Sequence, residues 1–381
     1  MSTVILRRAT YNYDTLKPQI FEILDFFCGS IIKKNSRVVI KPNLLTPASP
    51  DRAILTHPLV VKATVEYVLK KGARPQVSDS PGIGSFEKIF KESGIKDALI
   101  GLHVDFKEFE TSLFIDIGEP FKHIEIAEDA LKADVLINLP KLKTHTQMLL
   151  TLGVKNLFGC IVGLRKPEWH FRTGVDREMF AKLLVKIYKA VNPTVTILDG
   201  ILSMEGQGPG RGGIPRELGV LIGSNDAVAI DSAVCKMIGI DPDRLLTNKV
   251  AKEMGLVNDD INLKGDQVSE IKDFKLPQIT PLVFGPKRLH RVMRKHLVQR
   301  PACDESVCEL CEECLQYCPA NAISHDSQKI HFDYDVCIRC YCCIEVCPHG
   351  ALRAEETLPG KIVRKVLKLN KKSNASQGIL S

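Results

Sequence analysis

The sequence predicts an α/β fold, with a mostly parallel sheet covered by helices on both faces, followed by a small C-terminal α+β domain. Short β-branched runs alternate with helical patterns from Val4 to Pro281. The 381 residues exceed the size of a single hydrophobic core. Ten of the 13 cysteines lie between Cys303 and Cys347, which sets the C-terminal part apart. A composition of 44% hydrophobic and 25% charged residues is that of a globular protein and excludes a disordered or collagen-like chain.

Five apolar runs are expected to form strands, because a strand covered on both faces is apolar along its whole length. They are Arg37–Lys41, Pro75–Asp79, Asp134–Leu139, Thr194–Asp199 and Gly219–Gly223. Helical spacing of apolar residues predicts helices between them. The predicted helices are Leu16–Lys34, Pro58–Lys71, Phe86–Glu92, Asp176–Asn192 and Asn225–Ile238. Open parallel sheets bind ligands outside the carboxyl ends of their strands, so the residues that follow these strands are the first candidates for a site.

Cationic residues follow the strand Asp134–Leu139. Lys141 and Lys143 interrupt an apolar neighbourhood just past the strand end, and Lys155 follows in the next apolar stretch. Partly desolvated cations favour an anionic partner, whereas fully solvated lysines would have no such role. We therefore predict a small anionic ligand at this edge. The predicted substrate-binding residues are Lys141, Lys155, Asn156 and Asp199.

Three residues are predicted to be catalytic in this region: Lys143, His145 and His170. Lys143 would stabilise negative charge that develops on the substrate. Either histidine could supply a proton, because the pKa of histidine lies near neutral pH, and a structural role is the alternative for each. No Ser-His-Asp order, HExxH or Walker motif is present, so hydrolysis and ATP-driven chemistry lack support.

Three further segments carry less specific signals. The glycine-rich run Gly206–Gly213 is expected to be a flexible loop, either a substrate lid or a plain surface loop. The segment Ser80–Ser85 is a plain strand-to-helix turn or an anion cradle at a helix N-terminus. Asp231 is an unusual carboxylate because it lies among apolar residues of a predicted helix, whereas Asn225 or Asp226 is expected to cap that helix.

The C-terminal cysteines form two copies of one motif. Each copy has the spacing C-x-x-C-x-x-C-x-x-x-C-P, and every cysteine of the second copy follows its counterpart in the first at the same offset along the chain. Three closely spaced thiolates can bind three irons of a [4Fe-4S] cubane, whereas the fourth iron must be bound from elsewhere. The fourth cysteine of each copy is therefore expected to serve the other cluster. Structural zinc sites also use C-x-x-C pairs. A zinc site needs only four thiolates, however, and requires neither a third closely spaced cysteine nor a proline after the last one.

This region resembles the bacterial-type ferredoxins with two [4Fe-4S] clusters, over about Cys303–Ala354. The resemblance implies a small ferredoxin-like iron–sulfur domain that transfers electrons. It assigns the first cluster to Cys308, Cys311, Cys314 and Cys347, and the second to Cys337, Cys340, Cys343 and Cys318. Cys303 and Cys342 fall outside this pattern, either as buried thiols or as alternative ligands.

The N-terminal part resembles a family called domain of unknown function 362, which is often fused to such a ferredoxin. The segments that carry the resemblance are VVIKPNLL (38–45), THP (56–58), LPKLKTH (139–145), GVKNLFG (153–159) and the stretch from Asp199 to Asp231. The resemblance leaves the reaction open. The expected domains are the α/β domain at 1–285, a basic helical linker at 286–300, the two-cluster domain at 301–360 and a basic tail at 361–381.

The net charge of +7 is unevenly distributed. Residues 301–360 contain eleven acidic side chains against three basic ones, a balance of −8, whereas Pro286–Arg300 and Lys361–Lys372 each carry six Lys or Arg. Both basic segments have amphipathic helical spacing, so we expect them to pack on the protein, and we expect no nucleic-acid partner; a membrane surface or nucleic acid is the alternative. No run of about 18 uncharged apolar residues and no signal-peptide pattern occurs, which predicts no membrane span and a cytoplasmic protein whose cysteine cluster binds metal.

Together these features predict an iron–sulfur oxidoreductase. Its two-cluster module would exchange electrons with a small anionic substrate or cofactor bound in the α/β domain, and a redox partner protein or a small-molecule donor would supply them. The alternative is a non-catalytic electron carrier or accessory protein that docks a partner enzyme or helps to mature its cofactor. A salt-sensitive nucleic-acid or membrane-surface binder is the third interpretation.

Overall fold

The computed structural model describes residues 1–82, 84–163, 165–173, 176–257, 260–278 and 296–362. The chain divides into two compact units. The α/β unit comprises residues 1–169 and 176–277, and the cysteine-rich unit comprises residues 170–175 and 278–381. The expected basic helix Pro286–Arg300 lies largely outside the described residues, and so does most of Lys361–Lys372.

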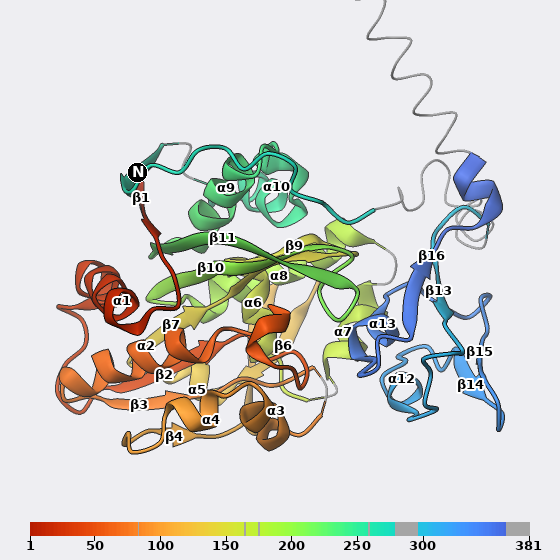
Figure 1. The fold of residues 1–381 in the computed structure, drawn as a ribbon, viewed down its shortest axis with the longest axis horizontal. Coiled ribbons are helices and arrows are strands. Elements are labelled where there is room, and N and C mark those ends of the chain that lie inside the picture. The colour runs from red at the N-terminus through yellow and green to blue at the C-terminus, as the bar shows by residue number, and fades with distance from the viewer. Residues whose placement is uncertain (83, 164, 174–175, 258–259, 279–295, 363–381) are drawn as a thin grey trace, which may run out of the picture. The chain divides into compact units, whose positions relative to one another are not determined.

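A ten-stranded sheet forms the centre of the α/β unit within the described residues (Figure 1). Eight of its strands follow the order β12-β1-β11-β10-β7-β2-β3-β4, and β8 pairs with both β10 and β9. Their bounds are β1 (Ser2–Arg8), β2 (Arg37–Pro42), β3 (Arg74–Val77), β4 (Asp105–Phe106), β7 (Val135–Leu139), β8 (Lys141–His145), β9 (Leu149–Thr151), β10 (Val195–Gly206), β11 (Gly213–Ser224) and β12 (Ile261–Gly265). Six of the pairings among these strands are parallel and three are antiparallel, which confirms a mostly parallel sheet.

Helices cover both faces of this sheet. Successive residues of a strand point to opposite faces, and accordingly Val38 and Ile40 of β2 join one core cluster while Val39 joins another. The first cluster packs against α1 (Tyr13–Cys28), α2 (Pro58–Lys70), α3 (Phe86–Glu92) and α4 (Ile95–Ala98). The second packs against α5 (Glu128–Leu131), α6 (Gly153–Asn156), α7 (Arg165–Thr173), α8 (Arg177–Val191), α9 (Ala227–Met237) and α10 (Leu246–Glu253). Short 3-10 turns lie at Pro50–Arg52, Leu157–Cys160 and Pro242–Arg244.

Local capping explains where the helices begin and end. The segment predicted at Phe86–Glu92 is α3, and Asp176 and Asn192 are the caps of α8. Asp226 caps α9 by accepting hydrogen bonds from the N–H groups of Val228 and Ala229. The predicted helix Leu16–Lys34 is wrong at both ends, because Asn12 caps α1 and the helix stops at Cys28, before Gly29.

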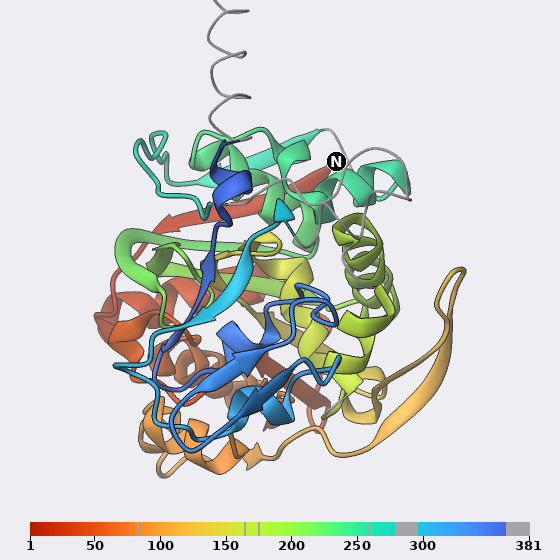
Figure 2. The ribbon, with the colours of Figure 1, turned by 90° about the vertical axis from the view of Figure 1, so that its right-hand side faces the viewer.

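A separate hairpin is formed by β5 (Ser112–Gly118) and β6 (Lys122–Ala127). Figure 2 shows it as a long ribbon that extends away from the central sheet. Ile124 and Ile126 are buried in the second core cluster, whereas Phe114 is 73% exposed. Phe114 pairs with Glu125, which lies between Ile124 and Ile126, so one face of the hairpin packs on the α/β unit while the other face is open to solvent.

The expected flexible loop at Gly206–Gly213 is instead the turn of a long hairpin. β10 and β11 pair from Thr196–Ser224 to Gly206–Gly213, so the strand continues well beyond Asp199. The Thr146 N–H donates to the carbonyl oxygen of Gly208 (3.0 Å). A Cβ at Gly208 would lie 2.4 Å from the carbonyl oxygen of Thr144, so the turn packs closely on β8. This packing contradicts the expected flexibility of the segment.

The cysteine-rich unit is an α+β structure, as predicted. β13 (Arg300–Cys303) pairs with β16 (Leu352–Glu355), and β14 (Ile323–His325) pairs with β15 (Ile330–Phe332), both antiparallel. Its helices in the described residues include α12 (Glu313–Gln316) and α13 (Cys342–Val346). α13 begins as many residues after the start of α12 as Cys337 lies after Cys308. The same offset separates the start of β16 from the start of β14. The secondary structure therefore repeats with the period of the cysteine motif.

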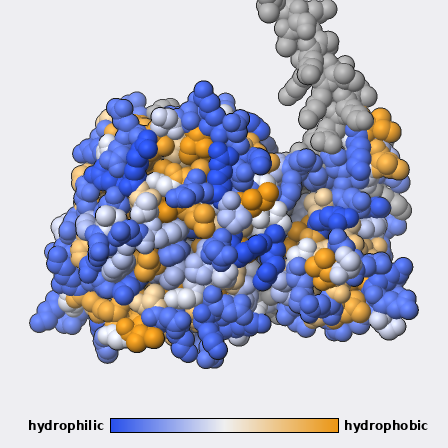
Figure 3. Space-filling view, in the orientation of Figure 1, coloured by the Kyte–Doolittle hydropathy of each residue, from blue (hydrophilic) through white to orange (hydrophobic). Residues whose placement is uncertain are grey.

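The surface shown in Figure 3 is mostly hydrophilic, with hydrophobic residues scattered over it. Large apolar side chains that are exposed include Phe114, Leu263, Leu358 and Ile362. In the part of the chain that the structure describes, no helix has both the length and the apolar character needed to cross a bilayer.

Candidate functional site

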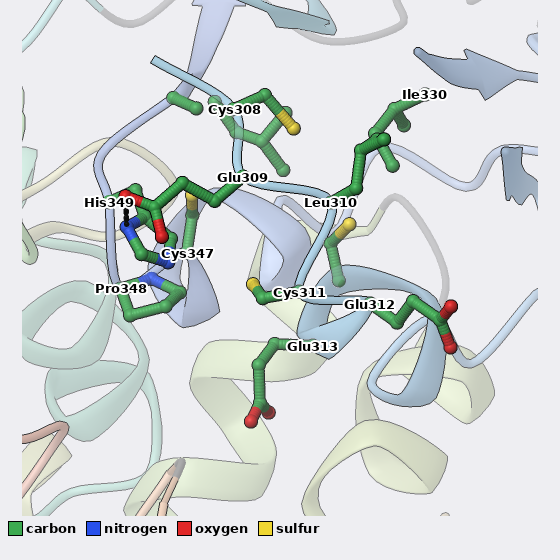
Figure 4. Close-up of a pocket in the computed structure, with 13 residues that line it drawn as sticks. Cys308, Glu309, Leu310, Cys311, Glu312, Glu313, Ile330, Cys347, Pro348 and His349 are labelled. Carbon is green, nitrogen blue, oxygen red and sulfur yellow. Dashed lines mark ion pairs between the residues drawn. The ribbon is translucent and has the colours of Figure 1, made fainter. Parts of the chain in front are cut away.

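Four cysteines drawn from both motifs line one cavity of the cysteine-rich unit. Cys308, Cys311 and Cys314 come from the first motif, and Cys347 comes from the second. Figure 4 shows the sulfur atoms of Cys308, Cys311 and Cys347 pointing toward a common space. Four thiolates around one cavity are the donor set that a [4Fe-4S] cluster requires. The geometry brings together the residues predicted for the first cluster.

The other four motif cysteines also lie near one another. Burial raises the pKa of the Cys318 thiol, and the neighbouring Cys340 and Cys337 raise it further. Burial likewise raises the pKa of the Cys343 thiol, with contributions from Cys340, Cys337, Cys314 and Cys318. The four residues predicted for the second cluster therefore lie near one another, with Cys314 of the first predicted set close to Cys343, and their assignment stays a prediction.

The backbone of each motif is curled so that its cysteines face one centre. Leu310 and Glu312 of the first motif have φ values of 51° and 64°, and Arg339 and Tyr341 of the second have 60° and 61°. Residues in this left-handed region turn the chain tightly and direct successive groups into one concavity. The two motifs repeat this conformation at equivalent positions, which explains why their cysteines adopt equivalent arrangements.

The two extra cysteines lie beside the predicted ligand groups. Cys303 lies beside Cys308, and Cys342 lies beside Cys340. Burial raises the pKa of the Cys303 thiol to about 12, and the contact with Cys308 adds to this shift. Both extra cysteines therefore lie next to cysteines of the motifs.

The carboxyl edge of the central sheet holds a buried ion pair. Lys141 Nζ of β8 lies 2.8 Å from Asp199 Oδ2 of β10, and both side chains are 0% exposed. The Tyr11 hydroxyl donates to Asp199 Oδ1 (2.8 Å) and accepts from Lys141 Nζ (2.9 Å). Burial lowers the pKa of Lys141, and Asp199 opposes that shift. These three side chains satisfy one another's polar groups.

His57 adjoins this group at the start of α2. Its backbone N–H donates to Asp199 Oδ2 (3.0 Å), and its ring stacks on Tyr11 with centroids 3.5 Å apart. His57 Nδ1 accepts from the Leu59 N–H (3.2 Å), which places the proton of the neutral ring on Nε2. Burial lowers the pKa of His57 to about 4, so the imidazole is neutral at pH 7.

A second buried ion pair lies at the ends of β2 and β3. Lys41 Nζ is 2.8 Å from Asp79 Oδ1, with side-chain exposures of 0% and 4%. Asp79 also accepts from the backbone N–H groups of Leu44 and Ser80, each at 2.9 Å. A Cβ at Gly159 would lie 2.1 Å from Asp79 Oδ1, so glycine is required for this close approach.

Lys143 binds the first of three asparagine side chains that are joined to one another by hydrogen bonds. Its Nζ donates to Asn43 Oδ1 and to the carbonyl oxygen of Ile54, both at 2.8 Å. Asn43 Nδ2 donates to Asn156 Oδ1 (3.0 Å), and Asn156 Nδ2 donates to Asn138 Oδ1 (2.8 Å). The structure thus joins Lys143 and Asn156, two of the predicted site residues, in one buried network.

Lys141 and Lys143 lie in a strand, whereas the sequence indicates an accessible segment past the end of the preceding strand. β8 places both side chains in the interior, with exposures of 0% and 1%. The physical reason is that each ammonium group binds an acceptor from a distant segment, Asp199 or Asn43. Anion binding by these two lysines stays a prediction.

The remaining predicted residues occupy separate positions. His145 ends β8, where its Nδ1 accepts from the N–H groups of Gln147 (3.1 Å) and Met148 (3.3 Å) and stabilises the turn to β9. Lys155 is half-buried on α6. His170 is buried on α7, a helix whose last residues belong to the cysteine-rich unit.

Asp231 holds the start of α6. Its carboxylate accepts from the N–H groups of Gly153 (2.8 Å) and Val154 (3.2 Å). Burial raises the pKa of Asp231 to about 8, and these two hydrogen bonds oppose the shift. The unusual position of this carboxylate therefore has a structural explanation.

The sequence interpretation did not single out several polar residues of the carboxyl edge. These residues are Tyr11, Lys41, Asn43, His57 and Asp79. Lys41 and Asn43 lie in the segment VVIKPNLL, and His57 lies in the segment THP. Their presence in segments that carry the family resemblance is the signal that could have pointed to them.

Comparison with known proteins supports both parts of the chain. Residues 38–236 match the family described as "Domain of unknown function (DUF362)", and residues 293–351 match the family described as "4Fe-4S dicluster domain". A thylakoid-associated protein of Synechocystis sp. is 35% identical over 306 residues, which cover 78% of this chain and 95% of the relative. The lactate racemase apoprotein from Thermoanaerobacterium thermosaccharolyticum aligns with a TM-score of 0.41 and 11% identity, over 62% of this chain and 57% of that chain.

The fold and the cysteine geometry define a class of protein in which an α/β domain is joined to a 4Fe-4S dicluster domain for iron–sulfur electron transfer. The family match spans just over half of the residues, and the chain belongs to the DUF362 family. Both resemblances inferred from the sequence are confirmed. The family description leaves the reaction open.

Proposed function

We propose that this protein is an iron–sulfur oxidoreductase that binds two [4Fe-4S] clusters and exchanges electrons with a small anionic substrate held by the α/β unit. The observation that carries the proposal is the single cavity lined by Cys308, Cys311, Cys314 and Cys347, because it joins ligands of both motifs. Cys318, Cys337, Cys340 and Cys343 would hold the second cluster. Bound clusters of this type supply single-electron transfer.

The substrate site is proposed at the carboxyl edge of the central sheet, where open parallel sheets bind ligands. Lys141, Lys155, Asn156 and Asp199 are proposed to bind the substrate, and Lys143, His145 and His170 are proposed to act on it. Lys143 would stabilise the negative charge that a substrate gains on reduction. The accompanying proton would come from one of the histidines.

The alternative is a non-catalytic electron carrier or accessory protein that docks a partner enzyme. A specific observation favours it. Lys141 already forms an ion pair with Asp199, and Lys143 already donates to Asn43. Cations that are satisfied within the protein attract an external anion less strongly than cations without acceptors.

Iron analysis of anaerobically purified protein tests the cluster assignment. We expect about eight irons per chain, since each cluster holds four. Cys318→Ser and Cys343→Ser should remove the same electron paramagnetic resonance (EPR) signal, because both residues are assigned to the second cluster. Cys314→Ser is the matched control and should remove the other signal. About four irons in the wild type, or different losses in Cys318→Ser and Cys343→Ser, would contradict the assignment.

Reoxidation kinetics test the substrate site. Dithionite-reduced protein is mixed anaerobically with small carboxylates or phosphate esters, and the rate of cluster reoxidation is compared with that of untreated protein. We expect at least one compound to accelerate reoxidation, and the half-buried Lys155→Met variant to lose that acceleration while it retains its iron. Absence of acceleration together with a stable complex with a partner protein would favour the carrier.

We further propose a cytoplasmic location, because none of the 13 cysteines forms a disulfide and a reducing compartment keeps cysteines available as cluster ligands. The Synechocystis relative is described as thylakoid-associated, which makes membrane association the competing outcome. Fractionation of cells lysed at low and high salt distinguishes the two. The domain boundaries 1–285, 286–300, 301–360 and 361–381 are retained as part of the proposal.

A further inference from the structure

The two cysteine motifs differ in charge at equivalent positions. Leu310 of the first motif and Arg339 of the second each lie two residues after the first cysteine of their motif, and both have left-handed backbone conformations. The residues at these positions therefore have matching backbones but different charges. Between their cysteines, the first motif carries three carboxylates, Glu309, Glu312 and Glu313, whereas the second carries the cation Arg339 and one carboxylate, Glu345.

Arg339 is a buried cation, only 2% exposed. Its Nη1 donates to the carbonyl oxygen of Cys337 (3.3 Å), and its Nη2 donates to the carbonyl oxygen of Tyr334 (3.4 Å). No carboxylate among the described residues lies within ion-pair distance of its guanidinium, and its Nε has no hydrogen-bond partner there. Burying a cation with neutral partners alone is costly, so this position favours an anion nearby.

Tyr334 holds a second cation next to Arg339. The ring of Tyr334 lies 5.2 Å from Cζ of Arg339 and 4.6 Å from Cζ of Arg300. The Tyr334 hydroxyl donates to the carbonyl oxygen of Pro301 (2.9 Å), which fixes the ring. Two positive charges are thus held on one aromatic side chain that lies just before the second motif in the sequence.

The carboxylates of the first motif are much more exposed. The side chains of Glu309 and Glu312 are 70% and 52% exposed, and they pair with His349 (3.2 Å) and His325 (3.0 Å). In Figure 4, Glu312 and Glu313 point away from the space that the sulfur atoms face. Solvent screens exposed charges far more than buried ones, so Arg339 has the larger effect on a neighbouring cluster.

We propose that Arg339 makes the cluster bound by Cys318, Cys337, Cys340 and Cys343 the more easily reduced of the two, so that electrons pass from the first cluster to the second. This inference rests on the proposed two-cluster assignment. Reduction adds one negative charge to a cluster, and a fixed, buried cation stabilises the reduced form more than the oxidised form. In the transfer the first cluster loses one electron and the second gains it, with no change in bonds or protons.

A potentiometric titration of the full-length anaerobic protein, monitored by EPR, tests the proposal. We expect two resolved one-electron steps in the wild type. Arg339→Leu introduces the residue found at the equivalent position 310. It should make the second cluster at least tenfold harder to reduce, about 59 mV for one electron, and leave the first step in place. Arg339→Lys retains a cation and should retain most of the separation between the steps.

A reciprocal variant provides the matched control. Leu310→Arg should raise the potential of the first cluster, because it places a cation at the equivalent backbone position. The step that remains in Cys318→Ser should be the lower one, since this variant lacks the second cluster. Coincident wild-type steps, or an Arg339→Leu variant with full iron content and unchanged potentials, would overturn the proposal.

The remaining outcomes are also decisive. If Arg339→Leu does not assemble its clusters, Leu310→Arg decides the question, and an unchanged first potential overturns the proposal. A wild-type protein with about four irons contradicts the two-cluster assignment itself, whereas a protein with about eight irons and the reverse order of potentials contradicts only the role of Arg339.

Discussion

Lys141 and Asp199 form an ion pair across 2.8 Å although neither side chain is exposed to solvent. The two residues lie 58 positions apart, on β8 and β10. Desolvating two charges is costly, and their attraction repays this cost only when their other polar groups are satisfied as well. Tyr11 provides these further hydrogen bonds, because its hydroxyl donates to Asp199 and accepts from Lys141.

Lys141→Met should lower the free energy of unfolding by about 3–5 kcal/mol, because it leaves the Asp199 carboxylate buried without its cation. Urea denaturation of the wild type and the variant measures the difference. The double variant Lys141→Met/Asp199→Leu removes both charges and should be more stable than Lys141→Met alone. A double variant that is less stable than either single one would show that the pair is not the source of the effect.

Gly159→Ala should destabilise the protein by about 3 kcal/mol, because the new Cβ would lie 2.1 Å from Asp79 Oδ1 and 2.6 Å from Lys41 Nζ. Gly101→Ala is the control. Gly101 has a φ of 81°, but a Cβ at this residue would meet no atom within 4 Å, so only backbone strain of about 1 kcal/mol applies. Equal losses for the two variants would contradict the close packing of Gly159 on the ion pair.

The stability of the protein should depend on His57 between pH 4 and pH 6.5. Burial lowers the pKa of His57 to about 4 in the folded state, below the ordinary 6.5. In this window the unfolded chain binds more protons, so the free energy of unfolding rises with pH and falls on acidification, by up to about 3 kcal/mol. His57→Asn retains a helix cap but cannot titrate. Urea denaturation at pH 7 and pH 5 should show a smaller difference in this variant than in the wild type.

Cys303→Ala and Cys342→Ala should retain the full iron content. Cys303 lies beside Cys308, and Cys342 lies beside Cys340, but neither falls at a cysteine position of the repeated motif, so each is expected to be a thiol beside a ligand and not a ligand itself. Anaerobic iron analysis of each variant measures this directly. Loss of about four irons in either variant would show that the extra cysteine binds a cluster.

Much of the fold follows from local patterns in the sequence. The strands β2 and β7 are short apolar runs, as covered strands must be, and α3 coincides with the predicted helix Phe86–Glu92. The cysteine motif is likewise a matter of local spacing, so its repeat is visible without a structure. The hairpin turn at Gly206–Gly213 could not be predicted, because its order comes from packing on Thr144.

The polar network of the α/β unit depends on distant contacts and is invisible in any short window. Lysine is rarely buried without a partner, so Lys141 is interpreted as an accessible residue until Asp199 is known to lie beside it. Tyr11 belongs to a segment before α1 and carries no motif. Its role appears only when the folded sheet places it against His57 and Asp199.

The position of β1 has a consequence for biosynthesis. Ile5 pairs with Gly223 of β11 on one side and with Lys264 of β12 on the other. A ribosome that adds about 5–20 residues per second leaves β1 without a partner strand for on the order of ten to forty seconds. Throughout that time the nascent chain exposes Val4 and Leu6, which are buried in the folded protein. Translation speed and chaperone supply should therefore limit the yield of folded protein, because an unpaired apolar strand invites aggregation.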